Sequence, residues 1–255
     1  MSGDGANVVL LHGLGNNEGV WSRIAGHWRP GLRVHTPRLP WHSGGITEWR
    51  HQDDSTALLA GLLDRIPGGA DLVVAHSFSS VLMLDLLSRR AAEGRPPDTA
   101  GVVLANPFYQ DDADDFRWDM IAPTLDDFPR TMAESIRLST PGHPIEAGRL
   151  ADMARRMTEW IGPYGWLRFF ENYLRTPLFP VQLVDTPVLV VGGGADRSAP
   201  AAHARTLADA LPSGECLILP RCGHFPMLEQ PARLAAAVHE FLDHRALRPR
   251  PLRTT

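Results

Sequence analysis

Short apolar segments recur along this chain, and each of them ends in a loop of polar or glycine residues. They cover residues 8–11, 72–75, 188–191 and 216–219. Runs of four or five apolar, partly β-branched residues are typical of strands that are buried on both faces of a parallel sheet. Helix-like stretches separate these runs. This alternation predicts an α/β protein with a mostly parallel sheet and helices on both faces.

The same pattern predicts individual elements along the chain. Strands are expected near 8–11, 33–36, 72–75, 101–105, 188–191 and 215–219, and helices near 19–28, 52–65, 78–93, 200–211 and 230–245. Only the stretch 108–185 breaks the alternation, with helical patterns that are rich in Met, Trp and Phe. At 255 residues, we expect one domain spanning 1–255.

A serine stands where one of these strands changes into a helix. Ser77 follows the apolar run 72–75 and precedes the helix-like stretch 81–87. A sharp turn from strand to helix strains the backbone of such a serine and projects its hydroxyl above the sheet. The turn needs small residues two positions to either side, and here Ala75 and Ser79 stand where glycine is usual. Ser77 is therefore a candidate nucleophile, although a serine after a strand is also common without any function.

Two further polar residues follow predicted strands, in the chain order serine, aspartate, histidine. Asp196 comes shortly after residues 188–191, and His224 shortly after 216–219. A serine hydroxyl needs a base to take its proton, and histidine oriented by a carboxylate is a common solution. Asp185 is the competing carboxylate, but it precedes its strand and would lie at the wrong end of the sheet. We therefore predict Ser77, Asp196 and His224 as the catalytic residues.

All 25 basic residues are arginine, because the chain contains no lysine. Schiff-base enzymes, pyridoxal-phosphate enzymes and Walker-type phosphate loops need a lysine, so these classes are excluded. The net charge of −4 and the dispersed acidic residues argue against a nucleic-acid partner. Cys216 and Cys222 fit no metal-ligand spacing and are expected to be reduced thiols. We expect no metal and no cofactor.

The ends of the chain and its hydropathy suggest where the protein works. Residues 1–7 do not resemble a signal peptide, and no apolar run reaches membrane-spanning length. We therefore expect a cytoplasmic protein with no membrane partner. The Arg- and Pro-rich segment 246–255 is expected to be a disordered tail.

The order of Ser77, Asp196 and His224, together with the loop His12-Gly13 after the first strand, resembles the α/β-hydrolase superfamily. The likeness is greatest to small single-domain esterases and C–C hydrolases, and it runs from about residue 8 to about residue 242. It implies a minimal fold that starts at the strand before the His-Gly loop. It also implies that the segment 108–185 forms a helical cap over the active site.

The resemblance assigns further roles. The backbone N–H groups of Leu14 and Phe78 would form the oxyanion hole. His12 would stabilise its own loop, and His76 and His42 would border the pocket. The other histidines are expected to be solvated, namely His27, His35, His51, His143, His203, His239 and His244.

Aromatic residues suggest the character of the pocket. Trp41 stands where relatives often have a glycine-rich turn, and it either narrows the pocket entrance or belongs to an ordinary surface loop. The aromatics of the cap either line an apolar acyl pocket or form the core of the cap; they are Trp118, Trp160, Trp166, Phe169 and Phe170. Trp118, Trp166 and Phe225 are predicted to bind substrate.

These observations predict a serine hydrolase that cleaves a carboxylic ester of a small apolar or aromatic molecule through an acyl-enzyme. The same triad also serves C–C hydrolases, lyases and acyltransferases, which the fold and triad alone do not separate. An arginine-only composition rich in Ala, Pro and Gly is typical of high-GC bacteria, where such enzymes often act in secondary metabolism. A ligand receptor that retains these residues without turnover is the remaining alternative.

Overall fold

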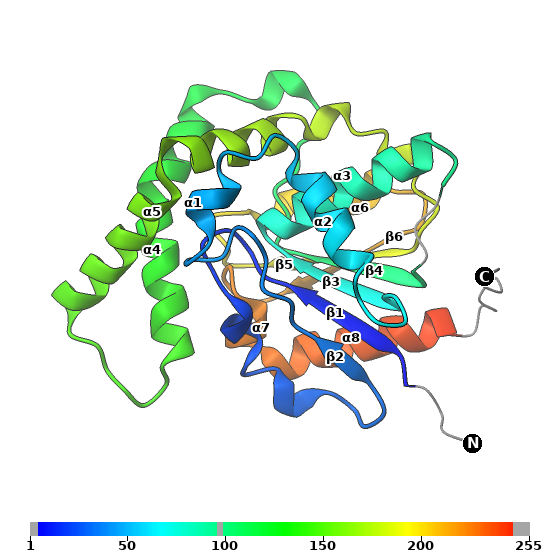
Figure 1. The fold of residues 1–255 in the computed structure, drawn as a ribbon, viewed down its shortest axis with the longest axis horizontal. Helices are drawn as coiled ribbons and strands as arrows, with labels where there is room; N and C mark the ends of the chain where they lie inside the picture. The colour runs from blue at the N-terminus through cyan, green and yellow to red at the C-terminus, as the bar shows by residue number, and fades with distance from the viewer. Residues whose placement is uncertain (1–4, 96–98, 247–255) are drawn as a thin grey trace.

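The computed structural model describes residues 5–95 and 99–246. Within these residues a six-stranded sheet has the order β2-β1-β3-β4-β5-β6, and every neighbouring pair of strands is parallel (Figure 1). The strands are β1 (Asn7–Leu11), β2 (Arg33–His35), β3 (Leu72–His76), β4 (Gly101–Ala105), β5 (Val188–Gly193) and β6 (Gly214–Leu219). The predicted α/β fold class is confirmed, and the carboxyl ends of all these strands lie along one edge.

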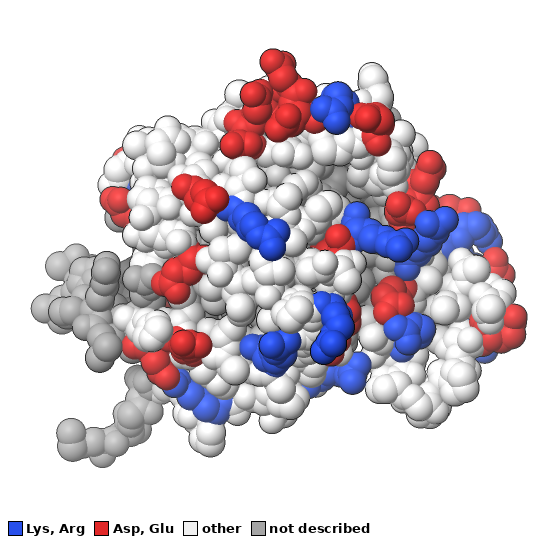
Figure 2. Space-filling view, turned by 180° about the vertical axis from the view of Figure 1, so that it is seen from behind, with Lys and Arg blue, Asp and Glu red and all other residues white. Residues whose placement is uncertain are grey.

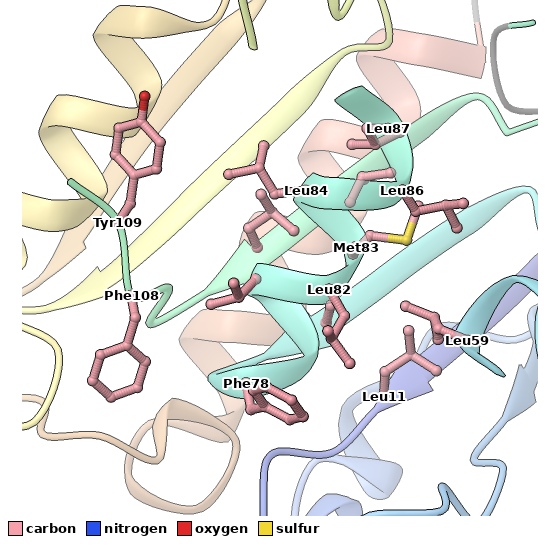
Figure 3. Packing of buried hydrophobic residues seen from close by; sticks show 14 of the residues in the cluster. Leu11, Leu59, Phe78, Leu82, Met83, Leu84, Leu86, Leu87, Phe108 and Tyr109 are labelled. Atoms are coloured by element: carbon pink, nitrogen blue, oxygen red, sulfur yellow. The ribbon is translucent and has the colours of Figure 1, made fainter. Parts of the chain in front are cut away.

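The four inner strands β1, β3, β4 and β5 are fully buried and almost entirely apolar because both faces of the sheet are covered there. In β1, Val8 and Leu10 pack on one face, whereas Val9 and Leu11 pack on the other. The first face is covered by α7 (Pro226–Glu229) and α8 (Pro231–Ala246), and the second by α2 (Ser55–Leu63), α3 (Phe78–Ala92) and α6 (Ala201–Ala210). Figure 3 shows the second core, in which side chains of α3 pack toward Leu11 and Leu59.

Two predicted helices differ from the observed elements. The stretch 19–28 forms the short 3-10 helices η1 (Glu18–Trp21) and η2 (Ala25–His27), because Gly19 and Gly26 disfavour a continuous helix. The predicted helix 52–65 is observed as the shorter α2, and the four-residue helix α1 (Ile46–Trp49), which was not predicted, precedes it. The second helix begins at Ser55 because the carboxylate of Asp54 accepts the N–H of Ala57 at 3.0 Å and caps it.

Residues between β4 and β5 form the helical segment that extends to one side of the sheet (Figure 1). It consists of η3 (Ala113–Asp115), α4 (Trp118–Ser139), α5 (Ala147–Leu174), η4 (Thr176–Leu178) and η5 (Val181–Leu183). The helices α4 and α5 pack against each other as a hairpin. The backbone of α5 kinks at Gly162, which has a φ of +61° and is followed by Pro163.

Charge is unevenly distributed over the surface. Figure 2 shows acidic side chains gathered at one edge of the face that it presents. The segment that leads into α4 contributes four exposed aspartates, Asp111, Asp112, Asp114 and Asp115. None of the helices in the described ranges is long and apolar enough to cross a membrane. The predicted tail at 246–255 lies outside the described residues, apart from Ala246 at the end of α8.

Candidate active site

Ser77 stands between β3 and α3 in the strained conformation that the sequence predicts. Its φ of +55° and ψ of −121° lie in a region that non-glycine residues rarely occupy. The side chain is 7% exposed, and both flanking small residues, Ala75 and Ser79, are fully buried. The turn therefore projects the hydroxyl of Ser77 beyond the carboxyl edge of the sheet.

A continuous hydrogen-bond chain joins the three predicted catalytic side chains. His224 Nε2 lies 3.0 Å from Ser77 Oγ, and His224 Nδ1 lies 2.8 Å from Asp196 Oδ2. Burial alone would raise the pKa of Asp196, but the charge and hydrogen bond of His224 and a hydrogen bond from Asn106 hold it below its ordinary value. Asp196 is therefore ionised at neutral pH. It contacts Nδ1 of His224, whereas Nε2 of the same ring faces Ser77.

Asn106 is a further member of the site, located directly after β4. Its Nδ2 donates to Asp196 Oδ2 at 2.6 Å and to the carbonyl of Gly223 at 3.2 Å. Its backbone has a φ of +50°, which asparagine tolerates better than most residues. Asp196 Oδ1 accepts the backbone N–H groups of Ser198 and Ala199, so both carboxylate oxygens are fully engaged.

The loop that carries His224 lies against the end of β5. A Cβ at Gly193 would lie 2.1 Å from the carbonyl oxygen of Gly223, so only glycine permits this approach. The carboxylate of Glu229 accepts the N–H groups of Gly223 and Phe225 at 2.7 and 3.0 Å. The close approach of Gly193 and the carboxylate of Glu229 together hold the loop on both sides of His224.

Two unpaired backbone donors flank the serine. Within the described residues, no acceptor is within hydrogen-bond distance of the N–H of Leu14 or of Phe78, the first residue of α3. The loop before Leu14 passes close to the serine, because a Cβ at Gly13 would lie only 3.0 Å from Ser77 Cβ. Such donors are the components of an oxyanion hole.

Two buried histidines support this arrangement as neutral rings. His12 Nε2 accepts the N–H of Leu39 at 3.3 Å, so Nδ1 donates to the carbonyl of Gly13 at 2.9 Å. His76 Nε2 donates to the backbone carbonyl of His224 at 2.7 Å. Burial lowers the pKa of His12 to about 4 and that of His76 to about 3. His12 therefore braces its own loop, and His76 braces the loop of His224.

A largely apolar cavity opens above Ser77, between the sheet edge and the helices α4 and α5. Of the residues predicted to bind substrate, it contains His76, Trp166 and Phe225. The cavity is also lined by residues that sequence patterns did not single out, among them Phe108, Met120, Phe128, Thr131, Met132 and Tyr173. In Figure 3, Phe108 and Tyr109 point to opposite sides of the chain after β4.

Other predicted pocket residues lie elsewhere. Trp41 is fully buried, and its Nε1 donates to the carbonyl of His12 and to Ser79 Oγ at 3.2 and 3.1 Å, so it does not narrow an entrance. Trp118 is 82% exposed at the start of α4 and is not part of the cavity wall. His42 is also outside the cavity wall, where its Nδ1 accepts the N–H of Gly44.

The prediction that His203 is an ordinary solvated residue is wrong. Its side chain is 8% exposed, and it forms part of the cavity wall in α6. A helical position with no flanking motif gave no signal of this placement. Within the described ranges, no group of three or more His, Cys, Asp or Glu side chains could hold a metal ion.

A parallel sheet with this Ser-His-Asp chain at its carboxyl edge, and helices inserted between β4 and β5, defines the class of α/β hydrolases. The chain belongs to the alpha/beta hydrolase family, whose model matches residues 8–237. The resemblance predicted from the sequence is confirmed, and the chain is an enzyme of the hydrolase class.

Several known proteins are similar to this chain. The pimeloyl-[acyl-carrier protein] methyl ester esterase of Nitrosomonas europaea is 25% identical over 248 residues, which cover 92% of this chain and 95% of that protein. The protein with the same description from Aromatoleum aromaticum is 27% identical, with coverages of 92% and 97%. The solved structure of a meta-cleavage product hydrolase from Pseudomonas fluorescens superposes with a TM-score of 0.64 at 17% identity, covering 95% of this chain and 92% of that one.

Proposed function

We propose that this enzyme hydrolyses a carboxylic ester of a small apolar or aromatic molecule through an acyl-enzyme. The observation that carries the proposal is the unbroken chain from Ser77 Oγ through His224 to Asp196 Oδ2, with distances of 3.0 and 2.8 Å. In the proposed reaction His224 takes the proton of Ser77 as the hydroxyl oxygen attacks the ester carbonyl carbon. Asp196 stabilises the resulting imidazolium.

The oxyanion of the tetrahedral intermediate would be held by the N–H groups of Leu14 and Phe78. Donors that are already oriented cost no reorganisation when the charge develops, and each contributes about 3 kcal/mol of transition-state stabilisation. His224 would then protonate the leaving alkoxide, which leaves as the alcohol. A water molecule would attack the acyl-enzyme by the same steps, releasing the carboxylic acid and restoring Ser77.

The cavity wall supports an apolar or aromatic substrate. Side chains around the space above Ser77 are mostly apolar, including Phe108, Phe128, Met132 and Trp166. Such walls bind a substrate mainly through the apolar area that it buries. The similarity to two esterases agrees with ester hydrolysis as the reaction.

Labelling with a fluorophosphonate, followed by mass spectrometry of the intact protein and its peptides, tests the proposal. We expect one adduct, on the peptide of Ser77, and none in Ser77→Ala. The same variant should lose at least about 10³-fold in kcat on p-nitrophenyl esters, because the oxyanion donors alone remain. An adduct on Ser79 or Ser80, or equal turnover by Ser77→Ala, would contradict the assignment.

A further inference from the structure

A second group of polar side chains lies beside the cavity, apart from the proposed triad. Tyr173 and His203 line the cavity, and Gln110 contacts His203. The backbone of Gln110 is fixed by Thr176, whose Oγ1 accepts the N–H of Gln110 at 3.1 Å and donates to its carbonyl at 3.2 Å. The Nε2 atom of Gln110 lies 3.4 Å from Nε2 of His203, and the ring of Tyr173 packs beside that of His203 with centroids 6.2 Å apart. The cluster is therefore built into the fold rather than loosely exposed.

The proton of His203 can be placed from its neighbours. Nε2 of Gln110 also lies 3.3 Å from the sulfur of Met120, and a thioether accepts hydrogen bonds but does not donate them. The amide NH₂ therefore faces both neighbours, and Nε2 of His203 is an acceptor. Burial lowers the pKa of His203, so its ring is neutral at pH 7. A neutral imidazole with an accepting Nε2 has its proton on Nδ1.

This Nδ1–H donor has no partner among the described residues. The ring of His203 packs beside those of Phe108 and Tyr173, with centroids 6.4 and 6.2 Å away, and the side chain is 8% exposed. Buried donors in proteins are nearly always paired, because an unpaired one costs folding free energy. His203 lies in the wall of the cavity, so a bound substrate could supply the acceptor that this N–H lacks. That would explain why the unpaired donor is retained despite its cost in folding free energy.

We propose that His203 is a specificity-determining residue whose Nδ1–H binds a neutral oxygen acceptor of the substrate, such as a ketone or ester carbonyl. The inference rests on the proposed ester hydrolysis and adds a substrate class to it. The ring of Phe108 lies between His203 and His224, with centroids 6.4 and 5.9 Å from theirs. The acceptor therefore belongs to a part of the substrate a few bonds away from the scissile carbonyl. A neutral donor among aromatic rings favours a neutral oxygen over a carboxylate, whose desolvation costs more.

Paired substrates test this subsite. We would compare p-nitrophenyl esters of straight-chain acids with esters of equal length in which one methylene is replaced by a ketone, at each position in turn. A second set would carry the ketone in the alcohol half. The quantity measured is the ratio of kcat/KM for the keto ester to that for the plain ester. For one position we expect a ratio well above one in the wild type and a fall of about 10-fold in His203→Phe.

Control variants separate hydrogen bonding from shape. His203→Gln retains an N–H donor and should recover part of the ratio, whereas His143→Phe makes the same substitution at an exposed site and should leave both rate constants unchanged. We also expect a higher melting temperature for His203→Phe, since it removes the unpaired nitrogen. Should His203→Phe fail to fold, His203→Leu provides the same comparison.

The outcomes distinguish the two proposals. Turnover of plain esters with the same ratio in the wild type and in His203→Phe would overturn the subsite alone. Stronger preference for esters bearing a carboxylate than for keto esters would overturn the neutral acceptor. No turnover of any ester, with no fluorophosphonate adduct, would instead overturn the proposed function.

Discussion

Replacing Asn106 by glycine tests how the carboxylate of Asp196 is held. The substitution removes the amide that donates to Asp196 Oδ2 at 2.6 Å. Glycine adopts the φ of +50° found at this position without strain, so the backbone of the turn should survive. The experiment therefore removes the two hydrogen bonds of this amide, to Asp196 and to the carbonyl of Gly223, without straining the backbone.

The structure sets the size of the expected effect. A hydrogen bond to a charged group contributes about 1.5–3 kcal/mol. Asp196 Oδ1 still accepts two backbone N–H groups, from Ser198 and Ala199, so the carboxylate stays in place and the lower figure applies. If that loss falls on the imidazolium-bearing transition state, kcat on a p-nitrophenyl ester decreases by about 10-fold with little change in KM.

The same substitution changes stability in a pH-dependent way. The pKa of Asp196 is below its ordinary value of 3.8 in the folded protein, and the Asn106 hydrogen bond is one cause. A carboxylate with a lowered folded pKa stabilises the protein above pH 3.8, and this contribution is lost as the pH falls through the folded pKa. The difference in unfolding free energy between wild type and Asn106→Gly should therefore be larger at pH 7 than near pH 3.

Urea denaturation at several pH values, together with ester kinetics, measures both effects. Arg221→Gly is the matched control, because Arg221 also has a positive φ of +55° but takes no part in the hydrogen bonds described for Asp196. It should leave kcat unchanged and give a pH-independent change in stability. An Asn106→Gly enzyme with wild-type kcat, and a stability difference that is equal at pH 7 and pH 3, would refute the reasoning.

Three further outcomes follow from the site. Gly13→Ala should reduce kcat at least 10-fold, because its Cβ would lie 3.0 Å from that of Ser77. An unchanged rate constant would mean that the loop has room to move. Trp166→Ala should change the relative kcat/KM values of short and long acyl esters, because Trp166 lines the cavity. Trp118→Ala changes an 82% exposed residue and should leave these values unchanged. Equal effects of the two substitutions would contradict the cavity assignment. Burial lowers the pKa of His12 to about 4 and of His76 to about 3, so the unfolded chain binds more protons below pH 6.5. Each should then cost about 2 kcal/mol of unfolding free energy between pH 7 and pH 5, and a flat stability profile over that range would contradict their neutral state.

The sheet could be predicted because its strands are buried on both faces. A strand such as β5, covered by α6 on one side and α8 on the other, has no room for polar side chains and leaves a continuous apolar run. Ser77, Asp196 and His224 could be predicted to lie together because each comes shortly after such a run. The carboxyl ends of parallel strands share one edge, so positions far apart in the chain necessarily meet there.

The walls of the cavity could not be predicted in the same way. Trp118 and Trp166 both belong to helices rich in aromatics, yet one is 82% exposed and the other lines the cavity. The difference depends on how α4 and α5 rotate against the sheet, which no local pattern reports. His203 was missed because it lies in α6 at a position with no flanking motif. No sequence pattern indicated that the amide of Asn106 donates to the carboxylate of Asp196.

Two residues near Ser77 that differ from the usual motif, Ser79 and Trp41, are hydrogen-bonded to each other in the structure. A glycine is usual at position 79, and the loop near position 41 is usually small, so Ser79 and Trp41 each looked like a separate departure. In the structure the hydroxyl of Ser79 donates to the carbonyl of His12 and accepts from Nε1 of Trp41. The indole also donates to the carbonyl of His12, and the carbonyl of Trp41 accepts the N–H of Gly15.

Both ends of the proposed oxyanion hole are therefore linked through the same small network. One end is the loop of Leu14, which His12 and Gly15 border, and the other is the start of α3, which contains Phe78 and Ser79. A buried indole needs a partner for its N–H, and a buried hydroxyl needs partners of its own. Trp41 without Ser79 would lose one of its two acceptors, and Ser79 without Trp41 would lose a donor, so we expect the two substitutions to be non-additive. Two positions that individually weaken the motif thus hold its two backbone donors at a fixed separation.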